Sequence, residues 1–188
     1  MMSDLELNAS TTAVILIDLQ RGILAYPTAP YPVGLVIQRG VELAGRFRSM
    51  GATIVYVRVD LANLVRGAAD QSHSVSNPPP PPEASEIVPE AGQQPGDILI
   101  TKRHWDAFGG TELERILRER GVRTVVLGGI ATHIGVESTA RSAASREFEV
   151  VLAEDATTSL SAEAHRYAIE NIFPRLGRVR LATQLHPH

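Results

Sequence analysis

The chain has 188 residues, which is enough for one ordinary domain with a substantial buried core. Apolar residues make up 44% of it and charged residues 21%, and the formal net charge of −3 excludes a strong basic field for nucleic acid or anionic membranes. The lack of cysteine excludes disulfide bonds, thiolate metal sites and a thiol nucleophile.

The sequence also shows no mark of a membrane or secreted protein. No apolar run approaches the ~20 residues needed to span a bilayer. The first residues, 1–4, show no basic stretch followed by an apolar one, as a secretory signal would. We therefore expect a cytoplasmic protein that binds neither nucleic acid nor membrane.

The first predicted elements are a strand, a helix and a second strand. Residues 12–18 form a near-continuous apolar run, which is typical of a strand buried on both faces of a parallel sheet. A helix follows, because apolar residues then recur at the three- and four-residue spacing of one helix face. That face is predicted to hold Val33, Val36, Ile37, Leu43, Ala44 and Phe47. Residues 53–59 repeat the strand pattern.

A long irregular segment, 60–97, comes next. It has no long periodic stretch, and Asn77 is followed by five prolines at 78–82, which favour a stiff polyproline II rod. A loop of this length is commonly a lid, a binding loop or an interface arm, and a surface excursion of no consequence is an equal alternative. No internal repeat or second domain is visible, so residues 1–188 are predicted to form a single domain.

Strands and helices alternate through the rest of the chain. Strand patterns recur at 98–101, 124–127 and 149–152, with a weaker one at 178–181. Between the first two, Thr111 and Glu114 are spaced as a capping box, and Gly121 ends the predicted helix. Its buried stripe is predicted to hold Leu113, Ile116 and Leu117.

Two more helices complete the pattern. One is lined by Val136, Ala140, Ala143 and Ala144. The other is capped by Ser161, buries Ile169 and Ile172, and is predicted to stop at Pro174. Strands that alternate with helices predict an α/β fold, with right-handed crossovers and helices on both faces of a parallel sheet.

Two charged residues end strands of this sheet. Asp18 follows the first apolar run and Lys102 follows the run at 98–101. Each has an ordinary interpretation, Asp18 as a turn former and Lys102 as a surface residue. Ligands of open parallel sheets bind beyond the carboxyl ends of the strands, so the two opposite charges together are candidates for a functional pair.

A turn rich in small residues is the third candidate element. Residues 128–141 read G-G-I-A-T-H-I-G-V-E-S-T-A-R, leaving a buried strand and entering a helix. Backbone N–H groups at the start of such a helix can bind an anion or oxyanion.

These elements resemble the isochorismatase-like hydrolase family, which includes cysteine amidohydrolases such as nicotinamidase and N-carbamoylsarcosine amidase. The resemblance covers nearly the whole chain, through I-L-I-D-L-Q at 15–20, T-K-R-H-W-D-A-F at 101–108, the turn at 128–141 and A-E-D-A-T at 153–157. It implies a Rossmann-like three-layer αβα sandwich with a six-stranded parallel sheet, a small-molecule substrate and a homo-oligomer. It also implies an Asp-Lys-Cys triad at Asp18, Lys102 and position 135, and a cis peptide between Ile130 and Ala131.

The chain departs from the cysteine members at position 135, which is Gly135, so hydrolysis through a thioester is excluded. Isochorismatases share this departure and carry H-I-G here, as in His133-Ile134-Gly135. Resemblance to that branch implies hydrolysis of a vinyl ether, with release of pyruvate, by a carboxylic acid and a water. Asp18 would then be the acid, and Lys102 would pair with it or hold a substrate carboxylate. Gly135 would leave room for a ring or a water.

Other positions are candidates for contact with the substrate. Trp105 and Phe108 are predicted to line the pocket, although aromatic residues after a strand are as often core. Arg58 is a candidate to bind a substrate anion. The turn residues Ala131, Thr132 and His133 are predicted to lie at the site, with capping or interface contacts as the alternative for His133.

Two positions differ from what the resemblance implies. Isochorismatases place a glutamine where Val59 stands, and the metal-binding aspartate-x-histidine run of nicotinamidases is replaced by Asp60-Leu61-Ala62. Asp60 and His73 alone are a poor metal set, so we expect neither a metal nor a cofactor.

Two alternatives to a hydrolase stay open. One is a catalytically silent pseudoenzyme that binds a small ligand or serves as an assembly protein. The other is a nucleotide binder, which is disfavoured because residues 18–22 lack the G-x-G-x-x-G turn.

Overall fold

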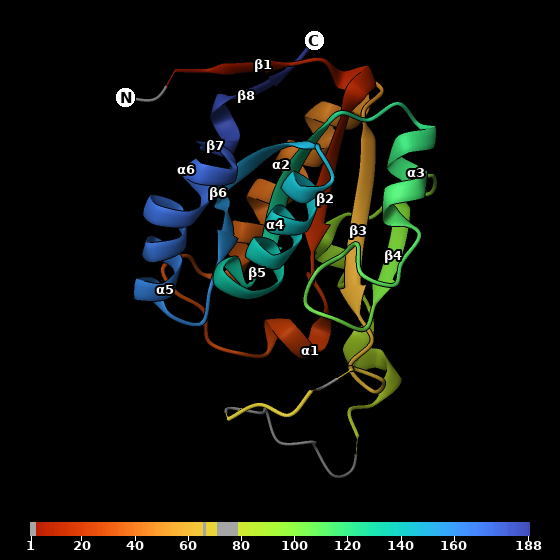
Figure 1. Ribbon diagram of the computed structural model, residues 1–188. Helices are drawn as coiled ribbons and strands as arrows, with labels where there is room; N and C mark the ends of the chain where they lie inside the picture. The colour runs from red at the N-terminus through yellow and green to blue at the C-terminus, as the bar shows by residue number, and fades with distance from the viewer. Residues whose placement is uncertain (1–2, 66, 71–78) are drawn as a thin grey trace.

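The computed structural model of the chain describes residues 3–65, 67–70 and 79–188. Its centre is a parallel sheet of six strands in the order β4-β3-β2-β5-β6-β7 (Figure 1). These strands are β2 (Thr12–Ile17), β3 (Thr53–Val59), β4 (Ile98–Lys102), β5 (Thr124–Ile130), β6 (Glu149–Thr158) and β7 (Gly177–Arg180). A second parallel pair, β1 (Leu5–Leu7) with β8 (Leu185–Pro187), brings the first and last strands side by side.

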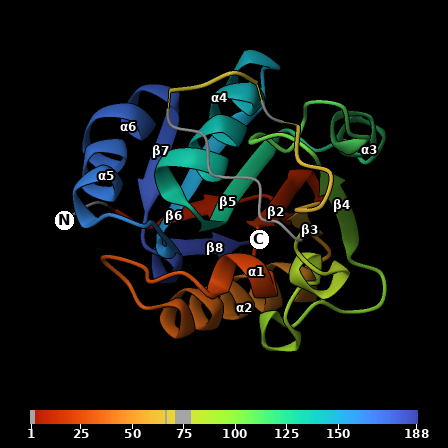
Figure 2. The same ribbon diagram turned by 90° about the horizontal axis from the view of Figure 1, so that it is seen from below.

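Helices cover both faces of the sheet, which confirms the predicted three-layer α/β fold (Figure 2). They are α1 (Arg21–Leu24), α2 (Val33–Ser49), α3 (Leu113–Glu119), α4 (Glu137–Ser145), α5 (Ala162–Tyr167) and α6 (Phe173–Leu176). One core cluster packs α2 against the sheet through Val36, Leu43 and Phe47. The other lies under α3, α4 and α6. Every residue of β2 and β5 is buried, as the continuous apolar runs predict.

The topology places the carboxyl ends of the strands at one edge. From β2 the chain moves outward through β3 to β4, then returns to β5 on the other side of β2 and continues to β7. The strand order therefore reverses between β2 and β5. In open parallel sheets, ligands bind beyond the strand ends at this reversal.

The predicted capping box at the start of α3 is wrong. The helix begins at Leu113 with Glu112 at its N-cap, one residue later than Thr111 requires. The Thr111 hydroxyl instead accepts a hydrogen bond from the backbone N–H of Leu113 at 3.2 Å and donates to the Ala107 carbonyl at 2.6 Å. Glu114 accepts from Arg146 at 2.9 Å, so local contacts engage the Thr111 side chain and a tertiary contact engages that of Glu114.

The predicted stop at Pro174 is also wrong. After α5 the chain makes a π-helical turn at Ala168–Ile172 and continues into α6, with Pro174 in the first turn of α6. The first turn of a helix tolerates proline, because the N–H that proline lacks has no partner within the helix there. The cap at Ser161 is confirmed, since its hydroxyl accepts from the N–H of Ala164.

The described part of the segment 60–97 begins beyond the carboxyl end of β3, passes next to α1 and returns to the start of β4 (Figure 1). Its described part contains two short 3₁₀ turns, Pro82–Ser85 and Pro89–Ala91. The predicted rod at 78–82 lies partly outside the described residues, which include only 79–82 of it. In the described part of the chain, no helix has the length and apolar character needed to cross a bilayer.

Candidate functional site

Asp18 and Lys102 form a buried ion pair at the carboxyl edge of the sheet. Lys102 Nζ lies 2.8 Å from Asp18 Oδ2, and the side chains are 1% and 9% exposed, respectively. The same Nζ donates to the backbone carbonyl of Trp105 at 2.7 Å. β3 lies between β2 and β4, and all three strands are parallel, so their carboxyl ends lie at one edge of the sheet. The two charges at the ends of β2 and β4 can therefore meet.

The backbone at Asp18 ends β2 abruptly. Its φ is 54°, in the left-handed region that aspartate tolerates better than most residues. Its N–H donates to the Val57 carbonyl on β3 at 2.8 Å, which holds this conformation. The side chain of Gln20, two residues on, accepts from the N–H of Val59 and donates to its carbonyl, so it ties the turn to the end of β3.

Burial dominates the electrostatics of Asp18. It raises the pKa of this carboxyl above the usual range, against the opposing effect of Lys102. Asp18 Oδ2 takes the contact with Lys102, whereas the buried Oδ1 has no hydrogen-bond partner among the described residues. One carboxyl oxygen is thus held by the lysine, and the other is buried without a hydrogen-bond partner in the described part of the chain.

Gly135 lies directly beside this pair. It belongs to a π-helical turn, Thr132–Val136, that precedes α4 and follows a cis peptide bond between Ile130 and Ala131, where the family resemblance implies one. A Cβ added at Gly135 would lie 3.1 Å from Lys102 Nζ and 3.3 Å from Asp18 Oδ2. A side chain at position 135 would therefore touch both charged groups.

Two contacts hold this turn against the sheet. Gly129 on β5 has a φ of 113°, and a Cβ there would lie only 2.0 Å from the Ile17 carbonyl, so only glycine allows β5 to approach β2 this closely. The Thr139 hydroxyl donates to the Gly135 carbonyl at 2.7 Å and accepts from the N–H of Ala107 at 3.1 Å. The turn is thereby linked to the segment that follows Lys102.

The pair lies at a cavity of about 330 Å³. The lining is mostly apolar, and its titratable side chains are Asp18, Lys102, His104 and Tyr26. The lining residues are Asp18, Gly22, Ile23, Tyr26, Val59, Leu61, Leu64, Pro80, Ala84, Lys102, His104, Trp105, Ile130, Ala131, Ile134, Gly135 and Leu160. Four of them come from the segment 60–97, so its described part forms a wall of the cavity.

Four of the predicted contact residues do not line this cavity, whereas Trp105 and Ala131 do. Phe108 is buried in the core and stacks on Phe148, with ring centroids 5.8 Å apart. Arg58 donates through Nε to the Thr101 hydroxyl at 3.0 Å. Neighbouring residues of a strand point to opposite faces, and Val59 takes the face toward the cavity.

Thr132 and His133 also lie outside it. Thr132 is fully buried, and its hydroxyl lies 2.9 Å from Nδ1 of His165. His133 is hydrogen-bonded through Nδ1 to the hydroxyl of Ser159. The turn after β5 therefore contributes Ala131, Ile134 and Gly135 to the cavity, and it aims the two residues between them elsewhere.

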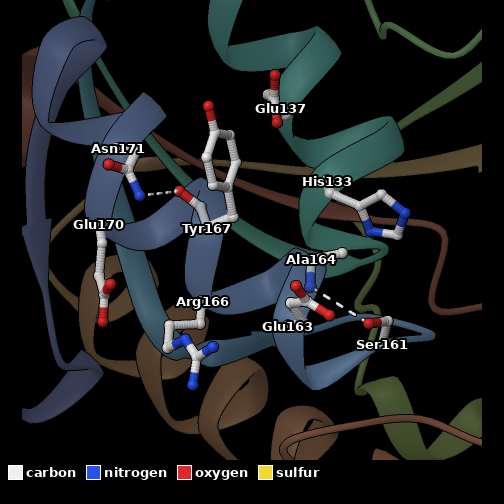
Figure 3. Close-up of a pocket in the computed structure, with 9 residues that line it drawn as sticks. All are labelled: His133, Glu137, Ser161, Glu163, Ala164, Arg166, Tyr167, Glu170 and Asn171. Carbon is white, nitrogen blue, oxygen red and sulfur yellow. Dashed lines mark hydrogen bonds between the residues drawn. The ribbon is translucent and has the colours of Figure 1, made fainter.

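His133 faces a second cavity, of about 630 Å³ (Figure 3). One side comes from His133 and Glu137, and the other comes from the segment 161–171, including Tyr167 and Asn171. Its lining contains no lysine and no aspartate. Of the two cavities, the first is therefore the one lined by the buried Asp18–Lys102 pair.

Several lining residues are not predicted from the sequence: Ile23, Tyr26, His104, Leu160, Leu61 and Leu64. They come from α1 and from loops that carry no periodic signal. The proximity of His104 and Trp105 to Lys102 was the available clue for this part of the wall. Among the described residues, no three histidine, aspartate or glutamate side chains lie close enough together to hold a metal ion. His73 lies outside the described residues.

Comparison with known proteins points to one family. The isochorismatase domain matches residues 12–184. The uncharacterized isochorismatase family protein YecD of Escherichia coli O157:H7 is 43% identical, over 96% of this chain and 97% of its own. A solved isochorismatase family protein from Burkholderia thailandensis has a TM-score of 0.90 and 40% identity, over 97% of both chains. The ureidoacrylate amidohydrolase RutB of Agrobacterium fabrum is 42% identical, over 46% of this chain and 40% of its own.

Proposed function

Because this chain belongs to the isochorismatase family, we propose that it is a hydrolase that works by acid–base catalysis through Asp18 and Lys102, without a covalent intermediate. Its substrate is a small carbonyl or carboxylated metabolite, and the reaction that suits the site best is hydrolysis of a vinyl ether. The observation that carries this proposal is the buried Asp18–Lys102 pair at the cavity, with Gly135 beside it.

The first step is a proton transfer to carbon. The raised pKa of Asp18 favours its protonated form, and the π electrons of the vinyl group take that proton at the terminal carbon. An oxocarbenium ion results, and Asp18 becomes a carboxylate. Lys102 stabilises that carboxylate from 2.8 Å away.

Water completes the reaction. It adds to the cationic carbon and returns a proton to Asp18, which restores the acid. The hydroxyl proton of the resulting hemiketal then passes to the leaving oxygen as the C–O bond to it breaks, which releases a ketone and an alcohol. General acid–base catalysis of this kind contributes ~10²–10⁴-fold to the rate.

Neither the turn nor α4 offers an obvious replacement nucleophile. Gly135 has no side chain, and the buried hydroxyl of Thr139 is engaged by the Gly135 carbonyl and the Ala107 N–H. This favours direct attack by water over an acyl-enzyme route.

The test is a turnover screen of small vinyl ethers and small amides with the wild type, Asp18→Asn and Asp60→Asn. Asp60 also follows a strand, but it contacts Asn63 and does not line the cavity, so it is a matched control. We expect vinyl ether turnover that Asp18→Asn lowers by ~10²–10⁴-fold and Asp60→Asn leaves intact. Ligand binding without any turnover would instead favour the pseudoenzyme.

A further inference from the structure

The cavity wall has little to offer an anionic substrate. Among the described side chains that line it, Lys102 is the one lysine or arginine, and its Nζ is already engaged by Asp18 at 2.8 Å and by the Trp105 carbonyl at 2.7 Å. His104 is exposed rather than deep in the cavity. A substrate carboxylate placed near Lys102 would have to compete with Asp18 Oδ2 for the same Nζ.

The described arginines near the cavity contact other partners. Arg21 lies 3.7 Å from Glu86, and Arg103 donates to the Asn63 carbonyl at 2.8 Å. Arg58 donates to Thr101 on the opposite face of β3. Among the described residues, no arginine lines this cavity.

The mouth of the cavity is apolar and exposed. Trp105, Tyr26 and Leu160 all line it, and they are 62%, 59% and 43% exposed. Large apolar side chains gathered at a concave site are typical of a surface that a ligand covers. Leu61, Leu64 and Ile23 extend this apolar lining.

On the premise of the hydrolase function above, we propose that this site takes an uncharged substrate with an apolar ring or alkyl group, and that it rejects dicarboxylates. The polar reacting group, a vinyl ether or carbonyl, reaches Asp18. The apolar group lies against Trp105, Tyr26 and Leu160. Each carboxylate of a dicarboxylate in the cavity would be buried without a partner, and this is far more costly than burying a neutral polar group.

A charge series of matched ligands tests this proposal by binding, independently of turnover. The probes are cyclohexanecarboxamide, cyclohexanecarboxylate and cyclohexane-1,2-dicarboxylate, which share one ring and differ in charge. Trp105 is the only tryptophan of the sequence, so its fluorescence reports binding at this cavity. In the wild type we expect the amide to bind most tightly and the dicarboxylate on the order of 100-fold more weakly, because its charges stay unpaired.

Two arginine variants sharpen the test. Leu64 lines the cavity and is half-buried, so Leu64→Arg adds a cation to the wall. Leu99 is 41% exposed on β4 and does not line the cavity, so Leu99→Arg adds the same charge elsewhere. We expect Leu64→Arg to raise dicarboxylate affinity about 10-fold with little effect on the amide, and Leu99→Arg to change neither.

The outcomes separate this proposal from the hydrolase function. Dicarboxylate binding as tight as that of the amide in the wild type would overturn it, as would failure of the amide to bind up to its solubility limit. Either result would leave Asp18-dependent turnover to be judged by the substrate screen. Conversely, the predicted charge preference without any turnover would contradict the hydrolase function alone.

Discussion

Restoring a thiol at position 135 tests whether the site keeps the geometry of a nucleophile beside an acid–base pair. In Gly135→Cys the new Cβ would lie 3.1 Å from Lys102 Nζ and 3.3 Å from Asp18 Oδ2. These contacts are tight and require shifts of a few tenths of an ångström. Gly135 lies in a helical turn, where replacing glycine raises the free energy of unfolding by about 0.5–1 kcal/mol. This gain offsets the tight contacts, so we expect little net change in stability.

The magnitude follows from the neighbouring charges. A unit charge at ~4 Å and an effective dielectric constant near 20 contributes about 4 kcal/mol, equivalent to roughly three pKa units. Burial and the acid group of Asp18 oppose this effect of Lys102. We therefore expect the thiol pKa to fall by about one to two units below the ordinary value of ~8.5.

The assay is the pH dependence of alkylation by iodoacetamide. The natural chain has no cysteine, so the introduced thiol is the only one that reacts. Ser145→Cys, at the exposed end of α4, is the matched control, and Gly135→Cys with Lys102→Met removes the cation. A thiol pKa in Gly135→Cys equal to or above that of the control would refute the reasoning.

Three other predictions address activity and stability. Because burial raises the pKa of Asp18, the acid form is lost as pH rises through that pKa, so kcat/KM for a vinyl ether should fall with rising pH; a rate that rises over that range would contradict this. Burial lowers the pKa of His165 from 6.5, so its contribution to stability is present above pH 6.5 and is lost as pH falls through the folded-state pKa. In His165→Gln, the melting temperature should therefore depend less on pH in this range. Thr139→Val removes the partner of the Gly135 carbonyl and of the Ala107 N–H, and urea unfolding should show a loss of about 1–3 kcal/mol.

The sequence predicts the parts of this structure that depend on local pattern. Apolar runs identify five strands of the main sheet and a weaker pattern identifies β7, and β3 has the predicted bounds of 53–59. Asp18 and Lys102 are identified because each follows such a run, and parallel strand ends meet at one edge. The pair β1–β8 is missed because strands of three residues are too short to show a period.

The cavity wall is predicted less well because it depends on contacts between distant segments. Phe108 lies three residues after Trp105 in the same segment, but its ring packs against Phe148 in the core. Tyr26 and Leu160 reach the mouth from loops separated by more than a hundred residues, and neither loop carries a pattern that marks it. Arg58 is a candidate from its residue type alone, but the register of β3 decides which face of the sheet its side chain takes.

The most direct test of the account is the rate of vinyl ether hydrolysis in Asp18→Asn, measured together with ligand affinity from Trp105 fluorescence. Asp18→Asn leaves Lys102 buried without its counter-charge, so the double variant Asp18→Asn with Lys102→Met, which removes both charges, is measured beside it. We expect kcat to fall by ~10²–10⁴-fold in both, while the affinity for cyclohexanecarboxamide stays within a few-fold of the wild type. A folded Asp18→Asn variant that keeps the wild-type kcat would contradict the central claim.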